Sequence, residues 1–119
     1  MAHYVDGYVI PVPKKRVNAY RRMAQKAGKI WRDHGALEFR ECVGDDLNVK
    51  MGLPFPRGLK IKPGETVIFS WIVYKSRAHR DSVNKKVMKD ARLMKIMDQP
   101  MPFDVKRMLY GGFKTIVEA

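Results

Sequence analysis

The sequence predicts an α+β protein in which two helices cover one face of a four-stranded antiparallel sheet. Four segments are rich in β-branched and aromatic residues, as strands are. One of the segments between them repeats its apolar residues with the period of a helix, and another follows a helix-capping serine. The elements follow one another in the order βαββαβ. We expect a single domain over residues 1–119, because a chain of 119 residues can bury a core of its own.

The first strand is expected at residues 4–13, which end in two prolines that stop a strand. A helix is expected over residues 14–34, because apolar side chains recur there at helical spacing. Gly35 follows at the position where a helix end favours a residue free to adopt positive φ. The side chains of the predicted apolar stripe are Val17, Tyr20, Ala24, Ala27, Trp31 and His34.

The second strand is expected at residues 36–44, where only one of the two alternating faces is mainly apolar, as in an edge strand. Residues 45–64 contain several glycines and prolines and are predicted to form a long loop. The third strand is expected at residues 65–74. Both of its faces are apolar, which predicts a central strand that is covered on both sides.

Ser76 and Asp90 are predicted to cap two helices, over residues 77–88 and 91–97. The last strand is expected at residues 108–117, with a β-bulge at its paired glycines, Gly111 and Gly112. This order of elements is the ferredoxin-like arrangement, in which the first and third strands are central. Because both main helices lie on one face, the other face is left uncovered. We expect two subunits to close these faces sheet against sheet in a homodimer.

Five motifs are distributed over nearly the whole chain. They are residues 4–9, residues 41–46, residues 69–71, the pair Arg80-Asp81, and the run 101–113, which is the most specific. Together these motifs resemble the YbaA-like family of bacterial proteins, which belongs to the dimeric α/β-barrel superfamily. The resemblance implies a ferredoxin-like subunit and a dimer whose two sheets form a barrel. It implies no particular reaction, because members of the superfamily differ in their chemistry.

The composition excludes several classes of protein. No run of 18 apolar residues is present, so we expect neither a membrane span nor a membrane partner. The single cysteine, Cys42, excludes an internal disulfide and a multi-thiolate metal site and suits a reducing cytoplasm, where we expect the protein. The sequence has no signal-peptide pattern, no phosphate-binding loop and no dinucleotide fingerprint. We therefore predict no metal and no cofactor.

Asp6 is the candidate catalytic residue, because it lies in the middle of a predicted central strand, where aspartate is disfavoured. In a cavity it would act as a base or as a group that orients a ligand. The alternative is a salt bridge to Arg107 or Arg80 that holds the strand in place. Neither reading decides whether the protein is an enzyme.

A polar group at the start of the last strand is predicted to line a pocket beside the sheet. The pocket would accept a small anionic or aromatic metabolite. In this hypothesis two aromatic side chains hold the apolar body of the ligand, and an arginine pairs with its anionic group. Packing and loop anchoring explain the same residues equally well. The candidate ligand-binding residues are Trp71, Asp104, Arg107 and Tyr110.

The chain has 24 Lys and Arg against 12 Asp and Glu, a formal net charge of +12. Much of this charge lies on the predicted helices and therefore on one side of the subunit. The alternative function is a basic module that binds nucleic acid non-specifically through Arg22, Lys26 and Lys29. A solvated basic face without a binding partner is the simpler reading. Sequence-specific RNA binding is not expected, because the aromatic and glycine residues lie on the fourth strand rather than the third.

Overall fold

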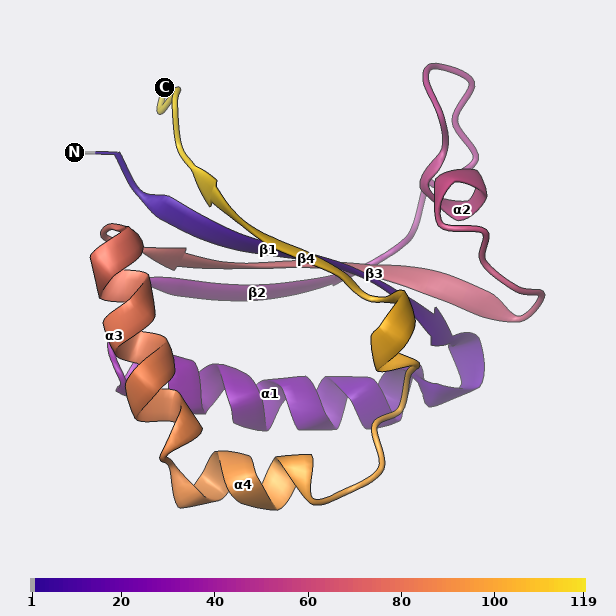
Figure 1. The fold of residues 1–119 in the computed structure, drawn as a ribbon. Coiled ribbons are helices and arrows are strands. Elements are labelled where there is room, and N and C mark those ends of the chain that lie inside the picture. The colour runs from indigo at the N-terminus through magenta and orange to yellow at the C-terminus, as the bar shows by residue number, and fades with distance from the viewer. Residues whose placement is uncertain (1) are drawn as a thin grey trace.

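The computed structural model describes residues 2–119, which form a four-stranded antiparallel sheet with its main helices on one face (Figure 1). The order across the sheet is β2-β3-β1-β4, so the first and third strands are central, as predicted. This is the ferredoxin-like fold. The strands are β1 (Tyr4–Pro13), β2 (Glu38–Val43), β3 (Glu65–Tyr74) and β4 (Leu109–Lys114).

Three helices lie on the same side of the sheet (Figure 1): α1 (Val17–Asp33), α3 (Arg77–Met88) and α4 (Ala91–Met97). Helix α4 packs against α1 and α3. Both predicted caps are confirmed. The Ser76 hydroxyl accepts the backbone N–H of His79 at 3.1 Å, and the Asp90 carboxylate accepts that of Arg92 at 2.9 Å. Short 3₁₀ turns precede α1 and β4, at Lys14–Arg16 and Val105–Arg107.

The core lies between the helices and the sheet. Under the first half of α1, Tyr20 and Ala24 pack on side chains of β1 and β3. Ile30, near the end of α1, packs in a second cluster with Val83 and Val87 of α3. These contacts fix α1 lengthwise across the sheet, with one of its flanks toward α4 and the other toward the edge strand β2.

The opposite face of the sheet is only partly covered. Helix α2 (Phe55–Gly58), in the predicted loop, lies on this side, and the Phe55 ring is 6.3 Å from the Phe69 ring (Figure 1). Phe69, Leu109 and Phe113 on strands β3 and β4 are about half exposed or more. The subunit thus presents a face with large exposed apolar side chains.

The prediction of a β-bulge at Gly111 and Gly112 is wrong. Strands β1 and β4 pair without interruption, with Gly111 opposite Gly7 and Gly112 opposite Asp6. The glycine at 112 serves side-chain packing instead. A Cβ atom there would lie 2.9 Å from the Cε2 and Cζ atoms of Tyr4, whose ring occupies that space.

Candidate functional site

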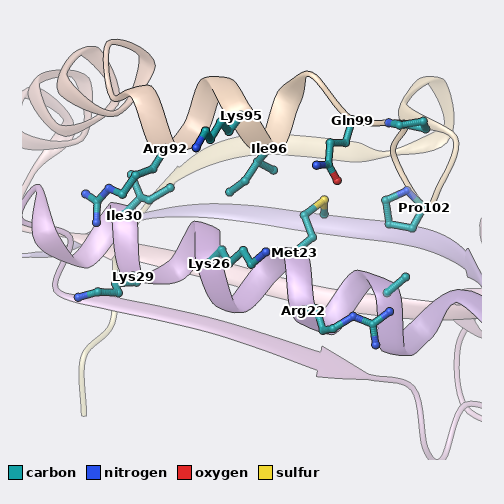
Figure 2. Close-up of a pocket in the computed structure, with 12 residues that line it drawn as sticks. Arg22, Met23, Lys26, Lys29, Ile30, Arg92, Lys95, Ile96, Gln99 and Pro102 are labelled. Carbon is teal, nitrogen blue, oxygen red and sulfur yellow. The ribbon is translucent and has the colours of Figure 1, made fainter.

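A groove of about 550 Å³ lies between α1 and α4 (Figure 2). Its base is apolar, and Met23 of α1 and Ile96 of α4 point into the space between the two helices (Figure 2). Within the described residues 2–119, no acidic side chain lines it. The groove therefore combines an apolar base with a positively charged rim. The basic lining residues are Arg22, Lys26 and Lys29 of α1 and Arg92 and Lys95 of α4.

The local sequence places these charges. Arg22, Lys26 and Lys29 follow one another at intervals of four and three residues, so they lie along one face of α1. The end of α1 is tied to the start of α4, because His34 Nε2 lies 2.8 Å from Asp90 Oδ2. Arg92 adds a second tie by donating to Asp33 at 2.7 Å. These contacts hold the two sides of the groove at a fixed distance.

Two of the five cations are partly neutralised. Lys29 and Arg92 both contact Asp33, at 3.6 and 2.7 Å. Arg92 and Lys29 lower the pKa of the Asp33 carboxyl. Within residues 2–119, Arg22, Lys26 and Lys95 form no ion pair. These three side chains leave uncompensated positive charge beside an apolar surface, an arrangement that attracts an anion with an apolar body.

Asp6 lies fully buried between the sheet and α3. Its carboxylate accepts a hydrogen bond from Arg80 Nη1 at 2.8 Å and one from the Tyr110 hydroxyl at 3.5 Å. Burial raises the pKa of Asp6, and the Arg80 guanidinium opposes that rise. Of the two salt bridges considered from the sequence, the one to Arg80 is present. Arg80 also lies over the Tyr4 ring, 5.0 Å from its centroid.

The five residues that the sequence suggested for one pocket do not come together within the subunit. Asp6 and Tyr110 are neighbours, but Trp71 lies on the other face of the sheet. The pairing of Asp6 with Ile72 explains this, because adjacent residues of a strand point to opposite faces. The Trp71 indole N–H donates to Glu38 Oε1 at 3.2 Å on the open face.

The remaining two candidates lie at the turn before β4. Arg107 forms a two-pronged ion pair with Glu65, at 2.7 and 2.9 Å, rather than with Asp6. Asp104 accepts the backbone N–H of Lys106 at 3.0 Å and so caps the turn. These contacts anchor the turn to the start of β3. Ligand binding by Trp71, Asp104, Arg107 or Tyr110 stays a prediction.

Sequence reasoning found only part of the groove. It identified Arg22, Lys26 and Lys29, but as a surface for nucleic acid. It missed the apolar base and the side chains of α4, because only the tertiary fold brings α4 beside α1. It also missed Glu41, a half-buried acid on the helix-covered face of β2. The sequence did hold a signal for Glu41, because this acid occupies one position of the otherwise apolar alternating set of the second strand.

Other classes of site receive no support from residues 2–119. No three His, Cys, Asp or Glu side chains of this part of the chain gather where they could hold a metal ion. None of its helices has the length and apolar character that crossing a membrane requires. Cys42 is a free, half-buried thiol.

The arrangement of helices and strands defines a ferredoxin-like α+β protein, and solved structures share it. Rv0793 from Mycobacterium tuberculosis superposes with a TM-score of 0.57 at 16% identity, over 100% of this chain and 99% of that one. A protein described as a dimeric ferredoxin-like protein, from an uncultured marine organism, gives a TM-score of 0.52 at 11% identity over 100% of both chains. At such identities the likeness shows the fold alone.

Comparison of the sequence, unlike that of the fold, identifies the family. Residues 3–105 match the family described as protein of unknown function DUF1428, and the chain belongs to that family. It is 44% identical over 115 residues to the uncharacterised protein YbaA of Escherichia coli K12, which covers 97% of each chain. The YbaA protein of Shigella flexneri matches to the same extent. The resemblance inferred from the five motifs is confirmed.

Proposed function

We propose that this protein binds a small amphipathic anion in the groove between α1 and α4. The observation that carries the proposal is the combination of an apolar base with three unpaired cations, Arg22, Lys26 and Lys95. The apolar body of the ligand would lie on Met23 and Ile96, where burial provides most of the binding energy. A carboxylate or phosphate on the ligand would pair with the rim, which sets its orientation.

The size of the groove supports a metabolite rather than a macromolecule. Its volume of about 550 Å³ lies within the range typical of small-molecule sites. The proposal keeps the class of ligand expected from the sequence, a small anionic or aromatic metabolite. Asp6 lies outside this groove, and its carboxylate holds Arg80 against Tyr4 and beside Tyr110.

We infer that two subunits assemble through their open sheet faces in the cytoplasm. The exposed side chains of Phe69, Leu109 and Phe113 favour such an interface. The dimeric description of one solved structural neighbour supports it. The free thiol of Cys42 suits a reducing compartment. Native mass spectrometry of freshly purified, nuclease-treated protein tests the dimer and the ligand binding proposed above, because it reports the mass of the assembly and of any bound small molecule.

Calorimetric titration with octanoate tests the groove directly, with octanol as the uncharged ligand of the same chain length. We expect octanoate to bind more tightly than octanol and to lose affinity as salt is added. The double variant Lys26→Gln/Lys95→Gln should weaken octanoate about tenfold, roughly the effect of one charged hydrogen bond. Lys15→Gln removes one positive charge outside the groove and should bind as the wild type does. Equal affinity in the double variant and the wild type would exclude the groove.

Non-specific nucleic-acid binding is the second candidate. It is favoured by the exposed row of Arg22, Lys26 and Lys29 along α1, which phosphate groups could follow. Reversing these three residues to glutamate should then abolish binding of a fluorescent oligonucleotide at low salt. Binding that survives the reversal at moderate salt would remove this candidate. The double variant Met23→Ser/Ile96→Ser separates the two functions, because only the amphipathic anion needs the apolar base.

A further inference from the structure

A second cleft lies on the other flank of α1. It has a volume of about 480 Å³ and separates α1 from the edge strand β2. Phe39 and Ile68 form apolar walls, and Gly28 of α1 lets the Phe39 ring come close, since a Cβ atom at Gly28 would lie 2.8 Å from Phe39 Cδ1. The volume of the cleft leaves room for a flat ring, and Phe39 in its lining offers that ring an aromatic contact.

A carboxyl group lies inside this cleft without a cationic partner. Glu41 accepts a hydrogen bond from the Tyr20 hydroxyl at 2.7 Å, and Ser70 lies opposite it on the neighbouring strand β3. None of the ion pairs formed by residues 2–119 includes Glu41. A carboxylate offers about four acceptor positions, so capacity for further donors remains. Burial raises the pKa of Glu41, as expected for a carboxyl group without a counter-ion.

The rim of the same cleft is basic. Arg21, Lys29 and Arg32 line it together with Gln25. Arg32 already donates hydrogen bonds to the backbone carbonyl groups of Ala36 and Leu37, and Lys29 already contacts Asp33. Arg21 is exposed and forms no ion pair within residues 2–119. The cleft therefore offers an acceptor at its base, apolar walls, and an available cation at its mouth.

We propose that this cleft binds a heteroaromatic anion of the guanine-nucleotide type. The ring would lie against Phe39 and donate N–H groups to Glu41, while the phosphate would reach Arg21 at the mouth. Donors on the ring edge match a carboxylate acceptor, whereas a ring that offers only acceptors would place its lone pairs against the carboxylate oxygens of Glu41. Tyr20 is a positioning residue, because its hydroxyl orients the Glu41 carboxylate. This site is separate from the α1–α4 groove, although Lys29 touches both.

Three related probes divide the interaction into its parts. GMP presents both the ring N–H donors and the phosphate, AMP lacks the N–H donor at ring position 1, and guanosine lacks the phosphate. We expect measurable binding of GMP below about 1 mM, in the range of weak specific ligands. AMP and guanosine should each bind about tenfold more weakly, since each loses roughly one charged hydrogen bond. Calorimetry and amide chemical-shift changes at residues 20, 39 and 41 provide the measurements.

Neighbouring arginines provide a matched control, because Arg21 lines this cleft and Arg22 lines the α1–α4 groove. Arg21→Gln and Glu41→Gln should each weaken GMP about tenfold, and Arg22→Gln should leave its affinity unchanged. Glu41→Gln keeps an acceptor for Tyr20, and circular dichroism establishes that the variant is folded. Tyr20→Phe should weaken GMP less than Glu41→Gln, as a positioning role requires.

The proposal is overturned if GMP does not bind up to about 1 mM, or if GMP and AMP bind equally. It is also overturned if Glu41→Gln binds GMP as the wild type does, or if Arg22→Gln weakens GMP as much as Arg21→Gln. The last result would indicate that GMP binds in the α1–α4 groove, which Arg22 lines, rather than in this cleft. Octanoate binding by Glu41→Gln distinguishes the two sites, since it depends only on the α1–α4 groove.

Discussion

His34 Nε2 at the end of α1 lies 2.8 Å from Asp90 Oδ2 at the start of α4. The same carboxylate accepts a hydrogen bond from Arg92 Nη2 at 2.8 Å, and Arg92 also reaches back to Asp33 on α1. Four side chains from the two helices therefore form one connected polar cluster. This cluster sets the spacing of the helices between which the basic groove lies, so its protonation affects both stability and the groove.

We predict a loss of stability in acid that depends on Asp90. Hydrogen bonds from Arg92 and His34 hold the pKa of Asp90 well below its usual range. A carboxyl group with a depressed folded-state pKa contributes stability above its unfolded value, near 3.9, and loses it as the pH falls toward the folded value. The melting temperature of the wild type should therefore fall below about pH 4, and that of Asp90→Asn should fall less. Thermal unfolding followed by circular dichroism between pH 6 and pH 2 measures both.

Two further acids, the buried Asp6 and the half-buried Glu41, titrate in the opposite sense, which allows a check on the role of Asp90. Burial raises the pKa values of Asp6 and Glu41, so their contributions decline as the pH rises from the unfolded value through the folded one. They cannot cause a loss of stability as the pH falls below 4. An equal acid loss in Asp90→Asn and the wild type would instead point to Asp33 or Glu65, whose pKa values are also lowered.

Asp6 and Asp81 give a second prediction, because both accept hydrogen bonds from Arg80 at 2.8 Å. Asp6 is fully buried, whereas the Asp81 side chain is 62% exposed. Asp6→Ala leaves the mostly buried Arg80 without its buried counter-ion and should lower the free energy of unfolding by roughly 3 kcal/mol. Asp81→Ala should change it by less than about 0.5 kcal/mol. Urea unfolding of the two variants compares them, and similar losses would contradict the burial argument.

Local patterns were sufficient to predict most elements of the fold. The bounds of β1 and β3 agree with the prediction, because Pro13 ends β1, Gly64 precedes β3, and β-branched and aromatic residues dominate both segments. The caps Ser76 and Asp90 were predictable because a cap depends on residues only two or three positions away. The bulge at Gly111 and Gly112 failed, since the reason for glycine lies in Tyr4, far away in the sequence.

The candidate site depends on tertiary contacts and was less predictable. Trp71 and Asp6 are both on central strands, but only the register of β1 against β3 places them on opposite faces. Arg107 pairs with Glu65, at a separation of 42 residues that no local pattern encodes. The basic residues of α1 were visible in the sequence, whereas the apolar base of the groove requires α4 to fold back beside α1.

The proposed dimer predicts that one charge on the open face separates the subunits. Phe69 of β3 is 48% exposed, and Met94 of α4 is 56% exposed on the helical side. Phe69→Glu should convert the dimer to a monomer, because an unpaired carboxylate buried between the two sheets is unfavourable. Met94→Glu adds the same charge at a similarly exposed apolar site and should leave the dimer intact. Light scattering coupled to size-exclusion chromatography measures the mass of each, and a dimeric Phe69→Glu variant would argue against this interface.

The adjacent glycines of β4 should respond differently to the same substitution. At Gly112 a Cβ atom would lie 2.9 Å from the Tyr4 ring, over which the Arg80 guanidinium lies. At Gly111 the nearest atom would be Phe113 Cε1, at 3.6 Å. Gly112→Ala should therefore lower the free energy of unfolding by about 1–3 kcal/mol through overpacking. Gly111→Ala makes only ordinary contacts and should be neutral or slightly stabilising, because alanine has less chain entropy to lose.

Replacing the obstructing ring tests the cause of this difference. In Tyr4→Leu/Gly112→Ala the smaller side chain leaves space for the new methyl group, so the double variant should be more stable than the sum of the single effects implies. Chemical denaturation of the wild type, the two single variants and the double variant gives the coupling energy directly. A coupling near zero would mean that Gly112 is required by the backbone of β4 rather than by Tyr4. Favourable coupling would identify close packing of the Tyr4 ring on β4 as the reason for glycine at this position.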